Sequence, residues 1–228
     1  MSIAAVVFDC DGTLVDSEPL ARAAWERSLA PYGYALDEAD YPGLVGLPYP
    51  RVHAFFAERV PGLAPPDEFW TSYSARLFGL IETDLAPFPD ALDTVHDLRE
   101  RGVPVAVASS SVRARLDRTL DRAGLADAFA VTVAGDEVAH GKPAPDMFLA
   151  AARGLGVAPE RCVAIEDSGP GVAAALAAGM TTVGVVRRAG DAGALADAHA
   201  VLERLSADAV LSQRGAASAA TPADRARR

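Results

Sequence analysis

Cysteine and histidine are scarce in this chain, and no apolar run is long enough to span a membrane without charges. The 228 residues include two cysteines, Cys10 and Cys162, and four histidines. The cysteines lie in separate apolar segments, and no histidine stands at zinc-ligand spacing from them, so we interpret them as reduced core thiols. The N-terminus has no basic stretch ahead of a long apolar run. We therefore expect a cytoplasmic protein without a membrane partner.

Positive charge is also limited. The chain has 21 lysines and arginines against 31 aspartates and glutamates, which gives a formal net charge of -10 and a pI near 4.8. Nucleic acids and anionic membranes bind to basic surfaces. The composition therefore argues against a nucleic-acid partner and favours small-molecule chemistry. We expect the protein to be a monomer or a homodimer.

Lysine occurs once, as Lys142 in the segment His140-Gly141-Lys142-Pro143. Arginine supplies every other basic residue. An arginine side chain is a planar fork, whereas lysine carries a compact ammonium. The single lysine therefore indicates a site that needs a compact positive charge, for example next to a phosphate oxygen and a carboxylate.

Short valine-rich apolar runs recur along the chain, and each is continuous and not alternating. Such runs are typical of strands buried on both faces of a parallel sheet. Helical segments separate them, so we predict an α/β fold with a doubly wound parallel sheet. The predicted strands are residues 3–8, 103–108, 130–134, 162–165 and 182–186, and the predicted core helices are residues 90–101, 112–123, 146–154 and 170–178.

Residues 16–87 interrupt this alternation. They contain helix-like pieces at residues 19–30, 51–60 and 67–82, joined by proline and glycine, and a concentration of aromatic residues that we expect to form mainly a local core. We interpret them as an inserted α-helical cap domain that acts as a lid. The predicted organisation is an α/β core of residues 1–15 and 88–211, a helical cap of residues 16–87 and a disordered tail of residues 212–228.

Polar residues follow the predicted strands at the points where ligands bind in doubly wound sheets. Asp9 and Asp11 leave the first strand on the same side, and two such close anions require a nearby cation. The other polar residues at these strand ends are Gly12 and Thr13 in the same turn, the serines 109 to 111, Lys142, and the consecutive acids Glu166 and Asp167. Together these residues could transfer a phosphoryl group to a carboxylate. Ser111 is expected to cap the following helix.

The order Asp9-Cys10-Asp11-Gly12-Thr13, Ser109 at a strand end, Lys142-Pro143 and Glu166-Asp167 resembles the haloacid dehalogenase superfamily of phosphohydrolases. The subgroup it resembles has a Rossmann-like core with a helical cap and includes the β-phosphoglucomutase-like phosphatases. The resemblance covers nearly the whole chain, to about residue 190. It implies a Mg²⁺-dependent phosphatase that acts on a small phosphorylated metabolite, most simply a sugar phosphate.

The resemblance also implies a role for each matching residue. Asp9 attacks phosphorus and becomes an aspartyl phosphate, and Asp11 protonates the leaving oxygen and then takes a proton from water. Gly12, Thr13, Ser109 with Ser110 beside it, and Lys142 bind the phosphate. Mg²⁺ is held by Asp9, the Asp11 carbonyl and Asp167, with Glu166 as a further ligand or an acceptor for bound water.

Three other activities use related residues. A phosphosugar mutase of the β-phosphoglucomutase type is the nearest alternative, but mutases carry a histidine four residues after the position of Ser17, and this chain has Ala21 there. A receiver-like phospho-acceptor module has no reason for a helical insertion of this length. A dehalogenase does not need the second aspartate or the metal acids. Selectivity is expected to depend on the cap loops, residues 17–21 and 46–51.

Overall fold

The computed structural model describes residues 2–37, 39–44, 49–188 and 190–213. The chain forms two compact units, Met1–Asp16 with Ala86–Arg228 and, inserted into this first unit, Ser17–Leu85. The predicted tail lies outside the described residues from residue 214 onward. Within the described residues, no helix is both long enough and apolar enough to cross a membrane.

The first unit contains a parallel sheet in the order β3-β2-β1-β4-β5-β6. All five neighbouring pairs are parallel, with Val7 opposite Ala106 on one side and Ala164 on the other. This doubly wound, Rossmann-like α/β core confirms the predicted fold class. The strands are β1 (Ala5–Phe8), β2 (Val105–Ala108), β3 (Val131–Val133), β4 (Cys162–Glu166), β5 (Thr181–Val185) and β6 (Ala200–Leu202).

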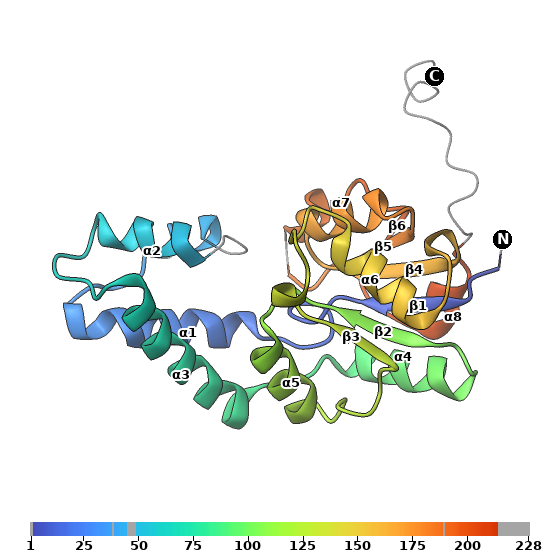
Figure 1. The fold of residues 1–228 in the computed structure, drawn as a ribbon, viewed down its shortest axis with the longest axis horizontal. Coiled ribbons are helices and arrows are strands. Elements are labelled where there is room, and N and C mark those ends of the chain that lie inside the picture. The colour runs from blue at the N-terminus through green and yellow to red at the C-terminus, as the bar shows by residue number, and fades with distance from the viewer. Residues whose placement is uncertain (1, 38, 45–48, 189, 214–228) are drawn as a thin grey trace, which may run out of the picture. The chain divides into compact units, whose positions relative to one another are not determined.

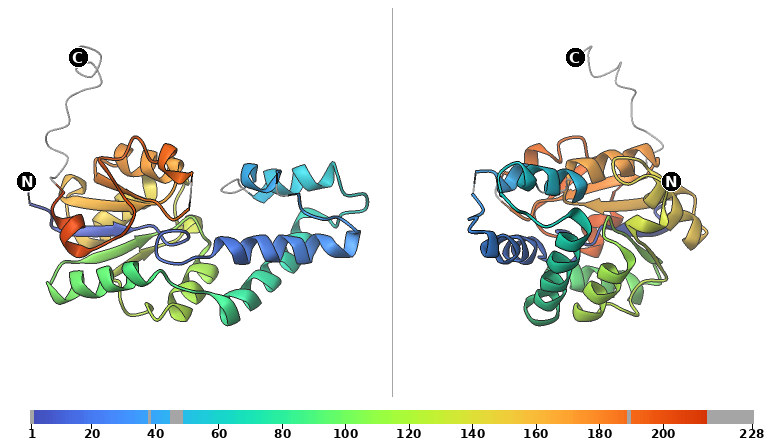
Figure 2. Two further views of the ribbon diagram at one scale, coloured as in Figure 1. Left: turned by 180° about the vertical axis from the view of Figure 1, so that it is seen from behind. Right: turned by 60° about the vertical axis from the view of Figure 1, so that its left-hand side comes forward.

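Helices cover both faces of this sheet (Figures 1 and 2). Helices α6 (Asp146–Leu155) and α7 (Gly169–Ala177) pack on one face, where Ala5 and Val7 join Met147 and Phe148 in the core. Helices α4 (Pro89–Glu100), α5 (Arg113–Arg122) and α8 (Ala207–Leu211) lie on the opposite face. Because both faces are covered, the central strands β1, β2 and β4 are fully buried, which explains their continuous apolar sequences.

The strand β6 and the helix α8 were not predicted, and one predicted helix cap was wrong. The strand β6 and helix α8 are short, and the side chains of β6 are only partly buried, so neither carries a strong apolar signal. Helix α5 begins after Val112 and has no side-chain cap. The Ser111 hydroxyl is used elsewhere, as described below.

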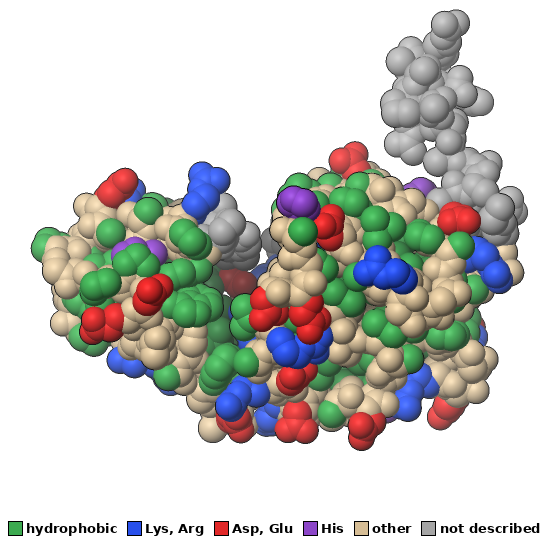
Figure 3. All heavy atoms as spheres, in the orientation of Figure 1, with side chains coloured by type: hydrophobic (Ala, Val, Ile, Leu, Met, Phe, Trp, Pro, Cys, Tyr) green, Lys and Arg blue, Asp and Glu red, His purple; other side chains and the backbone are tan. Residues whose placement is uncertain are grey.

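The second unit is helical, with α1 (Glu18–Leu29), α2 (Tyr49–Ala57) and α3 (Pro66–Asp84). Its core is aromatic: the Trp25 ring lies 4.1 Å from the Tyr73 ring and 5.4 Å from the Phe56 ring, centroid to centroid. These residues are buried, as expected for a local core, whereas Trp70 is 36% exposed. Acidic and basic side chains are interspersed over the visible surface of both units (Figure 3).

Candidate active site

The site lies at the carboxyl end of β1, where the strand order reverses between β1 and β4. The backbone amide of Asp9 donates to the carbonyl of Ile165 at 2.9 Å, which continues the pairing of the two strands by one residue. Asp9 is therefore fixed beside the end of β4. Glu166 is the last residue of that strand, and Asp167 follows it.

Lys142 lies between two of these carboxylates. Its ammonium forms ion pairs with Asp9 and Glu166, and its side chain is 6% exposed. Burial disfavours the charge on Lys142, but the two carboxylates outweigh burial and raise its pKa. Lys142 therefore presents a buried, charged ammonium next to Asp9.

Burial raises the pKa of Asp9 well above the ordinary value. The charge of Lys142 lowers this pKa, while the nearby Glu166 and Asp167 raise it further. Burial and the Glu166 charge likewise raise the pKa of Asp167 to about 7. The protein groups described here thus leave an excess of negative charge at this position.

Glu166 is completely buried and already bound by protein donors. One of its oxygens faces Lys142, and the other accepts from the Ser168 hydroxyl at 2.9 Å and from the amides of Asp167 and Ser168 at 3.2 Å. A side chain on Gly171 would overlap this carboxylate, so a glycine is needed where α7 passes it. Glu166 consequently holds Lys142 in place and has little capacity for another ligand.

Carboxylate oxygens of Asp9, Glu166 and Asp167 lie within 4.8 Å of one another. Because burial and mutual repulsion raise the pKa of Asp9 and Asp167, a bound divalent cation would stabilise their ionised forms. Hard cations such as Mg²⁺ prefer oxygen ligands of this kind. The residues therefore fit a divalent cation, with Asp9 and Asp167 as the acids that have oxygen atoms to offer.

The turn after β1 is shaped around Asp167. Gly12 has a φ of 84°, and a Cβ at this position would overlap the Asp167 carboxylate. Thr13 is buried, and its hydroxyl donates to Asp167 at 3.3 Å. The amides of Gly12 and Thr13 donate within the turn, to the carbonyls of Val15 and Cys10, so their binding of phosphate stays a prediction.

Asp11 leaves the same turn, but its carboxylate has different neighbours. One oxygen accepts from the Ser111 hydroxyl at 2.7 Å, and the other accepts from the Arg115 guanidinium at 2.7 Å. Ser111 therefore binds Asp11 instead of capping α5. Arg115 was not predicted, because one arginine among several on a helix carries no sequence signal that singles it out.

The other two serines of this segment differ in exposure. Ser109 is buried at the end of β2, and its hydroxyl accepts from the Ser111 amide at 3.1 Å. Ser110 is exposed. The structure thus brings Ser109, Ser111 and Asp11 together, and a phosphate contact by Ser109 or Ser110 stays a prediction.

Arg187 and Asp90, which were not predicted, form a second set of contacts to the turn of Gly12 and Thr13. The Arg187 guanidinium binds both oxygens of Asp90, at 2.8 and 2.9 Å, and donates to the Thr13 carbonyl at 2.9 Å. The Leu205 amide also donates to Asp90, at 2.7 Å. The side chains of Arg187 and Asp90 are 8% and 10% exposed, and they connect the turn of Gly12 and Thr13 to the start of α4.

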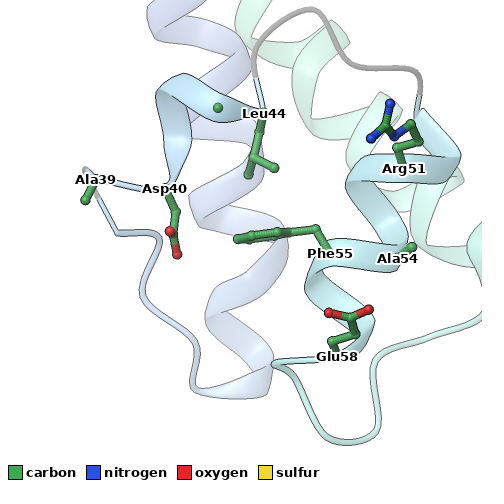
Figure 4. Close-up of a pocket in the computed structure, with 8 residues that line it drawn as sticks. Ala39, Asp40, Leu44, Arg51, Ala54, Phe55 and Glu58 are labelled. Carbon is green, nitrogen blue, oxygen red and sulfur yellow. The ribbon is translucent and has the colours of Figure 1, made fainter.

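The helical unit contains a separate cavity of about 510 Å³, shown in Figure 4. Phe55 extends from α2 toward Leu44 and Asp40 on the opposite wall, and Glu58, just after the end of α2, also lines the cavity. Arg51, which was expected in a loop that affects selectivity, lies within α2 and lines the same cavity. Residues 46–48 of the predicted loop lie outside the described residues.

Comparison with known proteins identifies the family. Residues 3–179 match the model of the haloacid dehalogenase-like hydrolases. The chain belongs to this family. A fructose-1-phosphate phosphatase of Escherichia coli is 35% identical over 184 residues, which cover 80% of this chain and 96% of that protein. Hexitol phosphatase B of the same organism is 33% identical over 187 residues, 79% of this chain and 82% of that protein.

A solved structure of CbbY from Rhodobacter sphaeroides in complex with phosphate superposes with a TM-score of 0.76. It is 30% identical, and the match covers 89% of this chain and 94% of that one. The family match and the named phosphatases place this chain among the family's phosphoric monoester hydrolases. The enzyme class predicted from the motifs is confirmed.

Proposed function

We propose that this protein is a Mg²⁺-dependent phosphatase that hydrolyses a small sugar phosphate through an aspartyl phosphate on Asp9. The observation that carries the proposal is the contact of Asp9 with Lys142 inside an acidic cluster that fits a divalent cation. The names of the related fructose-1-phosphate and hexitol phosphatases support a sugar phosphate as substrate.

The reaction has two steps. In the first, a carboxylate oxygen of Asp9 forms a bond to phosphorus, and the bond from phosphorus to the substrate oxygen breaks as Asp11 gives that oxygen a proton. In the second, water attacks the phosphorus of the aspartyl phosphate while Asp11 removes its proton. Inorganic phosphate leaves, and the Asp9 carboxylate is restored.

Charge neutralisation allows this chemistry. An anionic nucleophile and an anionic phosphate repel each other, and Lys142 reduces this repulsion from a position fixed by Glu166. A divalent cation, bound through Asp9 and Asp167, would supply further positive charge for the phosphate oxygens. Ser109, at the neighbouring strand end, would donate its hydroxyl to one of these oxygens.

The test is phosphate release from a panel of sugar and hexitol phosphates, with Mg²⁺ and after treatment with EDTA. We expect release that EDTA abolishes and added Mg²⁺ restores. Asp9→Asn should fold like the parent and lower kcat by about 10³-fold or more, since it removes the nucleophile. A folded Asp9→Asn protein with the parent's kcat would refute the mechanism, and interconversion of phosphosugars without net phosphate release would favour the mutase.

A further inference from the structure

The Asp11 carboxylate is held by two donors from one short segment of the core. Ser111 precedes α5 and Arg115 lies in its first turn, and each donates to a different oxygen of Asp11 at 2.7 Å. We propose that Arg115, assisted by Ser111, is a positioning residue that orients Asp11 for proton transfer. The inference rests on the proposed function, in which Asp11 exchanges a proton with the leaving group and with water.

The contacts constrain the carboxylate in both position and rotation. A single donor would leave the carboxylate free to turn about that contact, whereas donors to both oxygens fix its plane. The side chains of Arg115 and Asp11 are 21% and 26% exposed, so water competes only partly for these contacts. A general acid or base must come within hydrogen-bond distance of the proton that it transfers. Arg115 therefore reduces the orientations that Asp11 samples.

The same segment connects this contact to the proposed phosphate site. The Ser111 amide donates to the Ser109 hydroxyl oxygen at 3.1 Å. The segment between β2 and α5 therefore contains Ser109 and also holds Asp11 through Ser111. A shift of this segment would move the two residues together. The arrangement keeps the Asp11 carboxylate at a fixed position relative to the phosphate that Ser109 would bind.

Other arginines of α5 have different surroundings. Arg113 binds Glu137 and Thr132 at the protein surface. Arg118 is exposed on the same helix. Replacement of Arg118 therefore provides a matched control for loss of one positive charge from α5.

The experiment uses p-nitrophenyl phosphate with Mg²⁺, because nitrophenolate leaves without an acid whereas hydrolysis of the aspartyl phosphate needs a base. We expect Arg115→Met to lower kcat by about 10- to 100-fold. It should also show an initial burst of about one nitrophenolate per protein molecule, since the first step stays fast while the second becomes slow. Arg115→Lys should recover part of kcat, and Arg118→Met should match the parent.

A double-mutant cycle separates positioning from a structural role. In an Asp11→Asn background, Arg115→Met should change kcat by less than about twofold, because the group that it orients is already lost. The inference is overturned if the losses of kcat from Asp11→Asn and Arg115→Met multiply in the double variant. It is also overturned if the burst and the steady-state rate of Arg115→Met fall together, or if Arg115→Met keeps the parent's kcat. Ser111→Ala serves in the same cycle if Arg115→Met does not fold.

The outcome for the parent and for Asp11→Asn distinguishes the two proposals. A parent without Mg²⁺-dependent release of nitrophenolate, or an Asp11→Asn protein as active as the parent, would overturn the proposed function. With both as expected, an unaffected Arg115→Met protein overturns only the role of Arg115.

Discussion

Gly12 is required for two separate reasons, its backbone conformation and its contact with Asp167. We expect Gly12→Ala to destabilise the protein by about 3 kcal/mol, because a left-handed backbone and a displaced carboxylate both cost energy. Phosphatase activity should fall at least about 100-fold, since Asp167 must move. Urea unfolding and steady-state kinetics measure the two effects.

Gly124→Ala is the matched control for this substitution. Gly124 also has a positive φ, of 71°, but no atom lies within 4 Å of the position that its Cβ would take. It should cost only about 1–2 kcal/mol and leave kcat unchanged. Equal losses of stability and activity in the two variants would contradict the role assigned to the contact with Asp167.

The residues of the candidate site differed in how well the sequence predicted them. Asp9 and Glu166 were predicted together because Asp9 follows and Glu166 ends a buried strand, and the carboxyl ends of parallel strands share one edge. Lys142 was added because it lies in the loop after the third predicted strand and is the only lysine in the sequence. Arg115 and Arg187 depend on where the end of a long side chain reaches, which periodicity does not encode. Ser111 was assigned to a helix cap because its position fits that role locally, but a contact distant in sequence determines it.

The ion pair of Arg187 and Asp90 joins the end of β5 to the start of α4. We expect Arg187→Met to lower the free energy of unfolding by about 3 kcal/mol, because it leaves a buried carboxylate without its partner. The neighbouring Arg188→Met should cost less than about 1 kcal/mol, since Arg188 binds Asp16 at an exposed position. Urea unfolding of both variants tests this, and similar losses would contradict the buried pair's role.

The same pair gives stability a dependence on acid. Burial favours the neutral form of Asp90, but the hydrogen bonds from Leu205 and Arg187, together with the Arg187 charge, outweigh it and lower the pKa of Asp90. A lowered pKa in the folded state stabilises the protein above the pKa of the unfolded chain, and this contribution is lost as pH falls through the folded value.

We therefore expect the parent to lose more stability than Asp90→Asn between about pH 6 and about pH 3. Urea unfolding at both pH values measures the difference. Parallel loss in the two proteins would show that Asp90 is not a source of the acid sensitivity. Asp93→Asn, on the same helix, controls for the loss of one carboxylate.

Strands with continuous apolar sequences were predicted well, whereas the short edge strand β6 and the short helix α8 were not. The strands β1, β2 and β4 are buried on both faces, so nearly every residue carries the signal. The strand β6 has three residues with partly exposed side chains, and its place in the sheet comes from pairing with β5. Pairing between backbones leaves little trace in residue type.

The 228-residue sequence contains one lysine, and that lysine is buried in the ion pairs of the candidate active site. Amine-directed acylation should therefore modify Lys142 of the native protein only when the site opens. Mass spectrometry after labelling over a series of urea concentrations would follow that opening at a single position. Prompt acylation of Lys142 without denaturant would contradict its burial. An unmodified parent sequence thus carries its own site-specific chemical reporter, without any engineered label.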